Sequence, residues 1–543
     1  MTHTFVDNVP ASSWTLASLC SAAGLECSSS VVVTGLAFNS ARVRPGDLYL
    51  AMPGQKTHGA RYATQAVAAG AVAVLTDAEG AADSAEWGVP VVVADDPRRA
   101  MAALAVAFHH EPASRVPLFA VTGTNGKTTT TFLLEAGLAA LGMSVGTIGT
   151  IGFRLAAEPV AATTSTVTTP EAPDLQALFA AMVDRGAQAI AMEVSSHALS
   201  LARVAGTQFA VAGFTMLGRD HLDFHPTMED YFAAKASLFT ADRWHGAGCD
   251  HAVVCIDDEW GQRLAALVTD RPLTTVGRGP EADVRLVSLT TLPSGAQQLL
   301  LDLRGTELTA ELALPGDYNA MNAALALAMI DAAGLDATVA ATGLASASVP
   351  GRMQPIDLGQ AALGDHDGQA PRVVVDFAHT PQAVAEALRA VSVPGRRIAV
   401  LGAGGDRDVE KRPLMGAAAA ENAEVVVVTD DNPRTEDPSR IRAAVAQGAR
   451  EASARLSADQ GQPRVEVIEV PDRKAAIAEA LRLTGPQDAV LVLGKGHEQG
   501  QQLADRVVDF DDASVVVEVW RELTASREGA ELDESGPDEN GES

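Results

Sequence analysis

The sequence has few cysteines and no long apolar run. Its 543 residues include four cysteines, Cys20, Cys27, Cys249 and Cys255, and none has the CxxC spacing of a zinc site. This usage argues against a disulfide framework and indicates reduced thiols. No stretch approaches the roughly 18 apolar residues of a membrane helix, and the opening MTHTFVDNVP lacks the basic and apolar parts of a secretory signal. We therefore predict a soluble, cytoplasmic protein.

Basic residues are also in short supply. Forty lysines and arginines oppose 69 acidic residues, which gives a formal net charge of −29. Such a surface repels phosphate backbones and disfavours nucleic acid or an anionic membrane as a partner. Part of the charge lies in residues 526–543, SREGAELDESGPDENGES, which have no aromatic or β-branched side chain. We predict a disordered acidic tail there, and favour a solubilising role over a docking role.

The chain is too long for one core and corresponds to about three domains. Short apolar runs alternate with alanine-rich helical stretches, which is typical of α/β folds. We predict a small N-terminal α/β domain over residues 1–113. A central, doubly wound, largely parallel sheet of the P-loop ATPase type follows over 114–350, with β-hairpins near its end. A Rossmann-like α/β domain over 351–525 precedes the tail.

The predicted central domain opens with a phosphate-binding motif. The segment VTGTNGKTTT, residues 121–130, follows the apolar run VPLFAV and precedes an amphipathic stretch, so it indicates strand, loop and helix. Gly123 and Gly126 let backbone N–H groups face phosphate oxygens, Lys127 supplies a positive charge, and Thr128 can ligate Mg²⁺. The strict P-loop pattern has glycine where this chain has Val121. Triphosphate binding is predicted, with contacts also from Thr124, Asn125 and Thr129.

Such loops serve kinases, GTPases, motor ATPases and ligases, so this motif predicts a ligand more than a reaction. The NKxD base reader of a GTPase is absent. Polar groups at two later strand ends add candidates: Glu193, Ser195, Ser196 and His197, then Asp220, His221, Asp223 and His225 before a helix with Lys235. For Glu193 the pattern leaves two interpretations equally open: a Mg²⁺ ligand or a solvated strand end. The DHxDxH cluster could suggest zinc, but Mg²⁺ with one histidine ligand fits a phosphate site better. For Lys235, the alternative is a surface residue, because a lone lysine is usually exposed.

Nine motifs occur in order over about four hundred residues: VTGTNGKTTT, MEVSSHAL, RDHLDFHPTMEDYFAAK, LPGDYNAMNAALA, VPGRM, VDFAHTP, GAGGDRDVEKRP, TDDNPR and GKGHEQGQ. Together they closely resemble the Mur ligases, and within that family the enzymes that extend UDP-N-acetylmuramoyl-L-alanyl-D-glutamate in peptidoglycan assembly. The resemblance implies ATP-driven amide synthesis. The D-glutamate carboxylate attacks the γ-phosphate to give an acyl phosphate, and an amino acid amine then displaces phosphate.

The resemblance also implies roles around ATP. Lys127, Glu193, His221, Lys235 and His379 match catalytic positions. Mg²⁺ would be held by Thr128, Glu193, His221 and Lys235, the lysine as a carbamate formed with CO₂, which turns an ammonium into an anionic oxygen ligand. Beyond the phosphate loop, nucleotide contacts are implied for Asn319, Asn322, Arg352, Asp376 and His379, so that two domains would close over ATP.

Two further sets of residues match substrate positions in this family. The first predicted domain carries Ser40, Arg42 and His58 for the UDP group. The central domain carries Thr168, Thr169, Ser195 and Arg203 for the muramoyl-peptide.

The motifs of the third predicted domain bear on which amino acid is added. The DNPR motif is associated in this family with meso-diaminopimelate, through Asn432 and Arg434, because the planar guanidinium suits a distal carboxylate that L-lysine lacks. Gly494 and Glu498 match positions for its distal ends. The acceptor set is completed by Arg407, Arg412, Asp431 and Pro433. An Arg434 paired with Asp430 or Glu436 would leave L-lysine open, but meso-diaminopimelate is favoured.

The chain departs from the usual family pattern at several positions, which leaves room for an altered substrate preference: Asn39, Met216, Gly218, Cys255, Gln354, Gln382 and Ala403. Three competing interpretations are a P-loop ATPase that does not ligate, a folylpolyglutamate-type ligase and another Mur ligase. The GGDRD, DNPR and GKGHE motifs disfavour all three. We expect a monomer that acts on small molecules: ATP, the UDP-N-acetylmuramoyl dipeptide and an amino acid.

Overall fold

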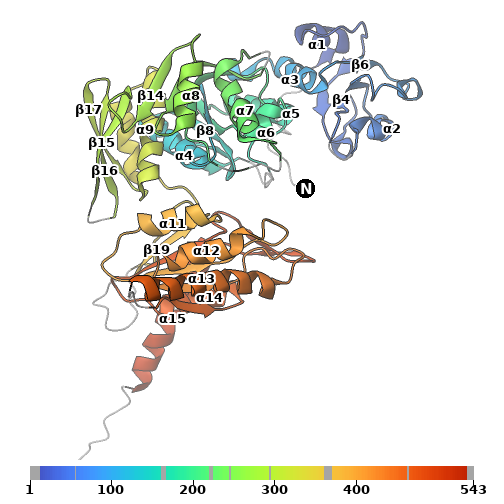
Figure 1. Cartoon of the computed structure of the whole chain (residues 1–543). Helices are drawn as coiled ribbons and strands as arrows, with labels where there is room; N and C mark the ends of the chain where they lie inside the picture. Colours follow the sequence, from blue (N-terminus) through green and yellow to red (C-terminus); the bar gives the residue numbers. More distant parts are fainter. Residues whose placement is uncertain are drawn as a thin grey trace, which may run out of the picture. The chain divides into compact units, whose positions relative to one another are not determined.

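The computed structural model of the chain divides into two compact units (Figure 1). The described residues are 13–54, 57–160, 167–218, 220, 224–243, 246–292, 295–359, 370–460 and 464–534, with backbone only for 460 and 526–534. Unit 1 comprises 1–292, 297–313 and 318–347, and unit 2 comprises 293–296, 314–317 and 348–543. Unit 1 thus contains both the N-terminal and the central predicted domains, whose boundaries stay predictions.

Unit 1 begins with a parallel four-stranded sheet in the order β3-β4-β5-β6. Alternate residues of β4 face opposite cores: Leu48 and Leu50 pack with helices α1 and α3, whereas Tyr49 packs with α2. Asp96 caps α3 through Arg99 N at 3.1 Å. The elements are β1 (Trp14–Thr15), α1 (Leu16–Ala22), β2 (Val32–Val33), β3 (Gly35–Ala37), β4 (Asp47–Leu50), α2 (Ala63–Ala68), β5 (Ala73–Thr76), β6 (Val91–Val93) and α3 (Pro97–Phe108).

An eleven-stranded sheet forms the rest of unit 1, in the order β10-β9-β8-β11-β7-β12-β13-β14-β15-β16-β17. The strands from β8 to β15 pair in parallel, and antiparallel strands close both edges. The predicted hairpins are β15 to β17. The strands are β7 (Leu118–Thr122), β8 (Val145–Gly149), β9 (Gly152–Leu155), β10 (Glu158–Pro159), β11 (Ala189–Glu193), β12 (Gln208–Phe214), β13 (Gly248–Cys255), β14 (Leu273–Gly277), β15 (Val284–Thr291), β16 (Gln297–Leu303) and β17 (Thr306–Leu312).

Helices cover both faces of this sheet, so the predicted doubly wound fold is confirmed. Ala212 and Phe214 of β12 pack with α5 and α7, whereas a Cβ at the intervening Gly213 would meet Met329 of α9 at 2.4 Å. The parallel strands are buried on both faces, which explains their continuous apolar runs. The helices are α4 (Lys127–Ala140), α5 (Ala172–Asp184), α6 (Ser196–Ser200), α7 (Met228–Thr240), α8 (Glu259–Leu267), α9 (Asp317–Ala332) and α10 (Ala337–Ala341).

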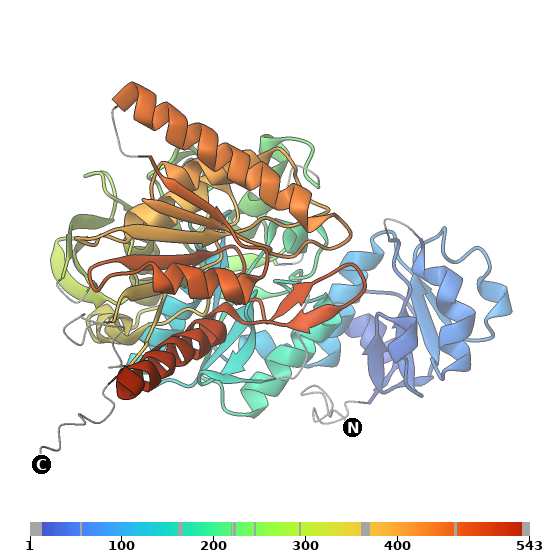
Figure 2. The same ribbon diagram turned by 90° about the horizontal axis from the view of Figure 1, so that it is seen from below.

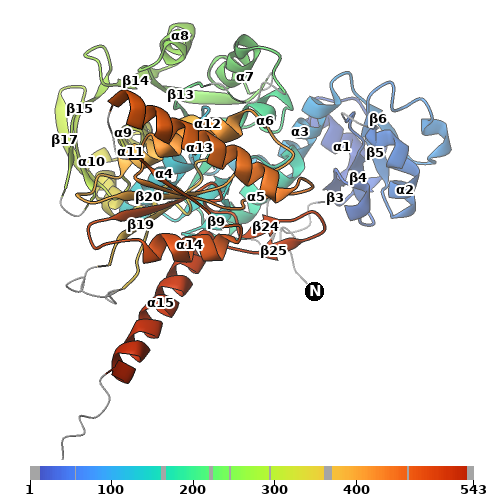
Figure 3. The same ribbon diagram turned by 60° about the horizontal axis from the view of Figure 1, so that its bottom comes forward.

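Unit 2 is a second α/β fold around a six-stranded sheet in the order β18-β19-β23-β20-β21-β22. Helices α11, α12 and α13 pack on one face, and α14 and α15 on the other (Figure 2). A short antiparallel pair, β24 and β25, extends from this unit (Figure 3). The elements are β18 (Gln354–Ile356), β19 (Arg372–Asp376), α11 (Pro381–Ala390), β20 (Arg397–Leu401), α12 (Lys411–Ala420), β21 (Val425–Val428), α13 (Pro438–Gln460), β22 (Glu466–Glu469), α14 (Arg473–Arg482), β23 (Ala489–Leu493), β24 (Gly500–Gln502), β25 (Val507–Asp509) and α15 (Asp512–Glu534).

A buried ion pair joins the two helices of the second face. Arg473, at the start of α14, donates from Nε and Nη2 to Asp512 at 2.7 Å each, and both side chains are fully buried. Arg473 also donates to the carbonyls of Leu493 and Asp430. The backbone of α15 continues as a helix to Glu534 and so includes residues 526–534 of the predicted disordered tail. Residues 535–543 lie outside the described ranges. No described helix is long and apolar enough to cross a bilayer.

Candidate active site

The phosphate loop lies between β7 and α4, where the sequence predicted it. Gly126 has φ +88° and begins the helix, and a Cβ there would lie 2.4 Å from Asn322 Oδ1. Gly123 has φ +146°, with Thr215 Oγ1 1.8 Å from the place of its Cβ. Both positions therefore require glycine. The Lys127 ammonium donates to the carbonyls of Gly123 and Thr124 at 2.9 and 2.8 Å, which keeps it folded over the loop.

The segment that follows β12 holds the phosphate loop through hydrogen bonds. Thr215 follows β12 and donates to the Asn125 carbonyl at 2.6 Å. Thr124 N donates to the Met216 carbonyl at 2.8 Å, and Gly218 N donates to Thr124 Oγ1 at 2.9 Å. The departures at 216 and 218 therefore contact the loop through backbone atoms, so their side chains are not needed for these bonds.

Glu193 ends β11 in register with Val121 of β7, so the pairing sets its carboxylate beside the loop. Glu193 is 1% exposed and accepts from Thr128 Oγ1 at 3.0 Å. Thr150, which the sequence analysis missed, donates to it from N at 2.8 Å and from Oγ1 at 3.1 Å. Glu193 is therefore not a solvated strand end. A buried carboxylate surrounded by hydroxyl groups is an oxygen-rich setting that suits Mg²⁺.

Lys235 lies on α7 and is 1% exposed, so the surface-residue alternative is wrong. Its Nζ donates to the Gly123 carbonyl at 2.7 Å and lies 4.6 Å from the centre of the Tyr231 ring. Burial, helped by the nearby Lys127 ammonium and opposed by Asp220, holds the pKa of Lys235 well below its ordinary value. This environment favours the neutral amine.

His221 and Asp223 lie outside the described residues, so the structure gives no account of the predicted histidine ligand. Among the residues that are described, no three His, Cys, Asp or Glu side chains cluster as a metal site. Thr128, Glu193 and Lys235 are the members of the predicted Mg²⁺ set that the structure places, and all three surround the start of α4. Thr129 is buried in the same first turn.

Of the predicted nucleotide residues of unit 1, Asn322 lies next to Gly126 of the phosphate loop, and Asn319 contacts Asn322. Asn319 and Asn322 are buried on α9, and Asn322 Nδ2 donates to Asn319 Oδ1 at 3.3 Å. In unit 2, the Arg352 guanidinium lies 4.4 Å from the centre of the Phe377 ring. His379 Nδ1 is 2.9 Å from the Phe377 carbonyl.

Asp376 is buried at the end of β19 and organises the backbone around it. Its carboxylate accepts from Met353 N at 2.7 Å and Ala378 N at 2.8 Å. Burial raises the pKa of Asp376, and the Arg352 charge opposes that rise. Its role in ATP binding stays a prediction.

A cavity of about 350 Å³ in the N-terminal sheet of unit 1 contains one predicted UDP residue, Ser40. His58 instead caps the 3₁₀ turn Gly59–Tyr62 through Ala60 N and contacts Asp77 Oδ1 at 3.1 Å. Neither His58 nor Arg42 lines the cavity. The departure Asn39 does line it and caps the turn Ser40–Arg42 through Ala41 N.

Within the described ranges, Arg98 is the one basic side chain that lines this cavity, and no sequence motif predicted it. Its Nη1 lies 3.3 Å from Glu171 Oε2. Arg203, a predicted muramoyl-peptide residue, shares the same carboxylate at 2.9 Å and donates to the Thr169 carbonyl at 3.0 Å. One carboxylate thus faces two guanidinium groups.

The other predicted muramoyl-peptide residues adjoin Glu193. Thr169 donates to the Glu193 carbonyl at 3.0 Å and accepts from Ser195 N at 3.2 Å. Ser195 caps α6 through Ala198 N at 3.2 Å. Thr168 Oγ1 lies 3.1 Å from Thr150 Oγ1. The structure therefore brings these three residues together at the end of β11.

The predicted acceptor residues of unit 2 gather at the ends of β21 and β23. Asn432 Nδ2 donates to Glu498 Oε2 at 2.7 Å. Gly494 has φ +114°, and a Cβ there would lie 2.5 Å from Asp431 Oδ2, so glycine is required for this close approach. The buried Asp431 carboxylate makes no hydrogen bond with any residue that the structure describes. Pro433 accepts from Glu436 N through its carbonyl at 3.1 Å.

Arg434 has left-handed backbone, φ +50°, and its N donates to the Gln502 carbonyl at 3.0 Å. Its guanidinium donates from Nε to Gln502 Oε1 at 3.0 Å and from Nη1 to the Gly405 carbonyl at 2.7 Å. It forms no ion pair with a described carboxylate, and its Nη2 has no described acceptor.

Other arginines take the carboxylates that could have paired with Arg434. Arg412 pairs with Glu436 through two bonds of 2.8 and 2.9 Å, and Arg442 pairs with Asp430. The alternative in which Arg434 is bridged to Asp430 or Glu436 is therefore wrong. Arg407 is exposed and contacts no carboxylate within the described ranges.

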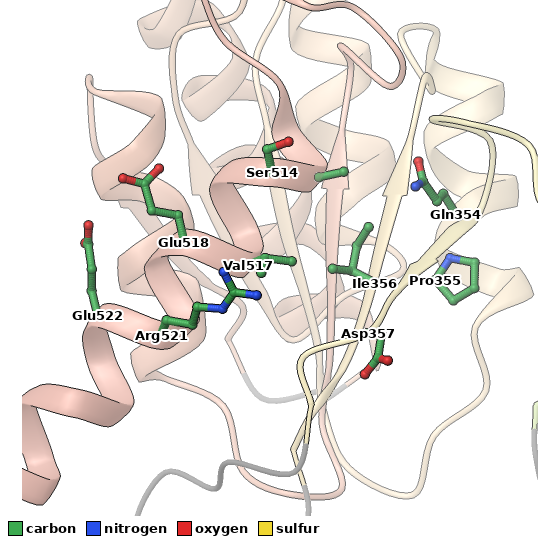
Figure 4. Close-up of a pocket in the computed structure, with 10 residues that line it drawn as sticks. Gln354, Pro355, Ile356, Asp357, Ser514, Val517, Glu518, Arg521 and Glu522 are labelled. Atoms are coloured by element: carbon green, nitrogen blue, oxygen red, sulfur yellow. The ribbon is translucent and has the colours of Figure 1, made fainter. Parts of the chain in front are cut away.

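A cavity of about 630 Å³ in unit 2 contains none of the predicted site residues. It lies between β18 and α15 and is lined by Gln354, Ile356, Asp357, Val517 and Arg521, among others (Figure 4). The predicted acceptor residues of this unit lie at the ends of β21 and β23 instead.

Family models match the chain in three consecutive segments. The model of the Mur ligase family catalytic domain matches residues 32–109, that of the Mur ligase middle domain 121–330, and that of the Mur ligase glutamate ligase domain 351–496. The chain belongs to the Mur ligase family. It is accordingly an ATP-dependent, amide-forming ligase, as the motifs predicted.

Relatives match nearly the whole length. A UDP-N-acetylmuramoyl-L-alanyl-D-glutamate--2,6-diaminopimelate ligase of Corynebacterium glutamicum is 46% identical, covering 86% of this chain and 88% of the relative. A ligase of the same name from Streptomyces coelicolor is 45% identical, covering 90% and 92%. A solved structure of a ligase with that name superposes with a TM-score of 0.65 at 28% identity, covering 97% of this chain and all of the other.

Proposed function

We propose that this Mur ligase joins meso-diaminopimelate to UDP-N-acetylmuramoyl-L-alanyl-D-glutamate in peptidoglycan biosynthesis. The observation that carries the proposal concerns Arg434, which belongs to the same motif as Asn432. Its guanidinium forms no ion pair with any described carboxylate, whereas Asn432 donates to Glu498. A planar guanidinium held by two neutral acceptors is ready for a carboxylate ligand. The names of the relatives point to the same acceptor.

The reaction proceeds in two steps. An oxygen of the D-glutamate carboxylate attacks the γ-phosphorus of ATP. The bond between this phosphorus and the β-phosphate oxygen breaks, ADP departs, and the product is an acyl phosphate. The acceptor amine then attacks the acyl carbon, loses a proton and expels inorganic phosphate, which leaves an amide. The loop around Gly126 and Lys127 cradles the phosphates, since backbone N–H groups and an ammonium neutralise the charge that moves.

Mg²⁺ is the expected metal, and its ligands would be Thr128 and Glu193 together with His221 and modified Lys235. When bound, the ion neutralises phosphate charge during transfer. Thr150 keeps the Glu193 carboxylate oriented with two hydrogen bonds, a role that needs no metal.

Lys235 is proposed to carry a carbamate. Its lowered pKa supplies a neutral amine, which can attack CO₂, form an N–C bond and release a proton. The product is an anion in place of a cation, so its repulsion from Lys127 becomes attraction.

At the acceptor site, Arg434 would bind the distal carboxylate, and Asp431 with Glu498 would bind the distal ammonium. Both substrates of the first step are nucleotides, and we place the reaction in the cytoplasm, where ATP is available. Small molecules are the only partners the proposal requires.

The test offers meso-diaminopimelate, L-lysine and D-glutamate separately to the purified chain with ATP, Mg²⁺ and the UDP-linked dipeptide. Phosphate release and product mass are measured. We expect product with meso-diaminopimelate and at least about a hundredfold lower kcat/KM with L-lysine, since the site would leave a guanidinium unpaired. Preferred use of L-lysine would overturn the acceptor assignment, and no phosphate release with any acceptor would overturn ligation.

A further inference from the structure

Lys495 is a fully buried lysine among the predicted acceptor residues, and the sequence analysis assigned it no role. It follows β23 within the GKGHE motif and is 0% exposed. Its ammonium donates to the Gly500 carbonyl at 2.6 Å, Glu498 Oε2 at 3.2 Å and Asn432 Oδ1 at 3.4 Å. All three of its N–H donors are therefore used inside unit 2.

These bonds fix which way the Asn432 amide faces. Asn432 Oδ1 accepts from Lys495 Nζ and from Gln502 N at 2.8 Å. Both partners are donors, so the Nδ2 group must point the other way, where it donates one hydrogen to Glu498 Oε2. Its second hydrogen has no described acceptor and can meet a carboxylate oxygen. A flipped amide would present Oδ1 to that carboxylate instead and repel it.

The same ammonium polarises Glu498. Oε2 accepts from both Lys495 and Asn432, whereas Oε1 accepts from no described group. One carboxylate oxygen is thus held in place and the other is left for a cationic ligand.

We propose that Lys495 is a positioning residue for the incoming amino acid: it orients the Asn432 amide as a donor for the distal carboxylate and Glu498 Oε1 as an acceptor for the distal ammonium. Lys495 itself touches neither. This inference rests on the proposed function, because it names what sets the acceptor preference of that same site.

The first test compares Lys495→Met with the wild-type chain. Methionine fills similar space but has no donor and no charge. We expect KM for meso-diaminopimelate to rise about tenfold or more, with kcat within about threefold and KM for ATP within about twofold. The matched control is Lys474→Met, since Lys474 bridges exposed Glu518 and Glu522 on the surface, and its kinetic constants should match the wild type.

A double-mutant cycle separates positioning from mere packing. If Lys495 acts through Glu498, adding Lys495→Met to Glu498→Gln should raise KM for meso-diaminopimelate by less than about threefold further. Should Lys495→Met not fold, Lys495→Arg keeps the charge but cannot fit its planar head to all three acceptors, and we expect the same selective rise in KM, at least about threefold.

Unchanged KM, an equal rise for all three substrates, or full additivity in the cycle would overturn the inference. A wild-type chain that does not use meso-diaminopimelate would defeat the proposed function itself. The two failures are distinguishable because the second is seen before any variant is made.

Discussion

Arg98 and Arg203 both approach the carboxylate of Glu171, and this sharing leaves one positive charge beyond what Glu171 can neutralise. Arg98 lines the cavity that holds Ser40, a predicted UDP residue, so we expect the excess charge to attract the diphosphate of the substrate. The chain as a whole is strongly acidic, so an anionic substrate needs such a local site.

We expect Arg98→Ala to raise KM for the UDP-linked dipeptide about tenfold, because a charge-assisted hydrogen bond is lost, while KM for the acceptor stays unchanged. Steady-state kinetics with each substrate varied in turn measures this. Arg99→Ala is the control, since the next arginine is half-exposed and pairs with Asp96 on the surface. Equal effects of the two changes would show that Arg98 does not bind the substrate.

A second single-residue prediction concerns Arg434. Arg434→Lys keeps a charge but loses the planar fork, so kcat/KM for meso-diaminopimelate should fall about a hundredfold with ADP affinity intact. Acceptor kinetics and calorimetric ADP titration measure the two effects. Arg440→Ala, an exposed arginine at the start of α13, should behave as wild type. Wild-type use of meso-diaminopimelate by Arg434→Lys would refute the carboxylate role.

At the scale of single residues, the sequence predicted the residues that belong to a motif. It did not predict the residues that contact them from elsewhere in the chain. Gly126, Thr128 and Glu193 stand in recognisable patterns. Thr150 and Arg98 do not, because their partners lie 43 and 73 residues away and only the folded sheet brings them together. Local pattern contains no information about such pairs.

At the scale of elements, apolar runs located the strands well because buried parallel strands are apolar throughout. Their spatial order, β8-β11-β7-β12, is not readable from the runs, although it puts Glu193 and Thr215 on either side of the phosphate loop. His58 is a different case. A motif match predicted a UDP contact, and the structure shows that the side chain caps a turn and contacts Asp77, so its role in UDP binding stays a prediction.

The two ends of α4 offer a matched test of the loop. Gly126 precedes the helix and Gly142 follows it, with φ +88° and +80°. Alanine strains the backbone at both, by about 1 kcal/mol. Only Gly126→Ala also drives a Cβ to within 2.4 Å of Asn322 Oδ1, whereas nothing lies within 4 Å at Gly142.

We therefore expect Gly126→Ala to weaken ATP binding at least about tenfold, because the loop must move away from α9. Gly142→Ala should lower only the free energy of unfolding. Nucleotide titration and chemical denaturation of both variants measure these outcomes. Equal nucleotide affinities would contradict the proposed dependence of the loop on Asn322.

Across the whole molecule, two partly buried histidines link stability to acid. Burial lowers the pKa of His109 in unit 1 and of His497 in unit 2 to about 4. An unfolded histidine takes up its proton near pH 6.5, so unfolding binds protons between pH 6.5 and 4. Stability is therefore present above pH 6.5 and is lost as the pH falls through this window.

His109→Phe should remove about 3 kcal/mol of this acid dependence from unit 1, because phenylalanine does not titrate. Denaturant unfolding at a series of pH values between 7 and 4 measures it. His110→Phe, at the exposed neighbouring position, should keep most of the wild-type slope, because the charge of His110 lowers the pKa of His109 less than burial does. An unaltered slope in His109→Phe would mean that this ring is not a source of the acid sensitivity.

The ion pair of Arg473 and Asp512 has a consequence for how this protein can be shortened or recombined. Asp512 begins the last helix, whereas Arg473 also holds the carbonyl of Leu493, the residue before Gly494. A truncation before Asp512 would leave a buried cation without its partner at a cost of about 3–5 kcal/mol. A chimera that exchanges C-terminal helices between relatives must therefore transfer both residues or neither. The final helix therefore supports the backbone next to Gly494 through Arg473 and is not a dispensable appendage.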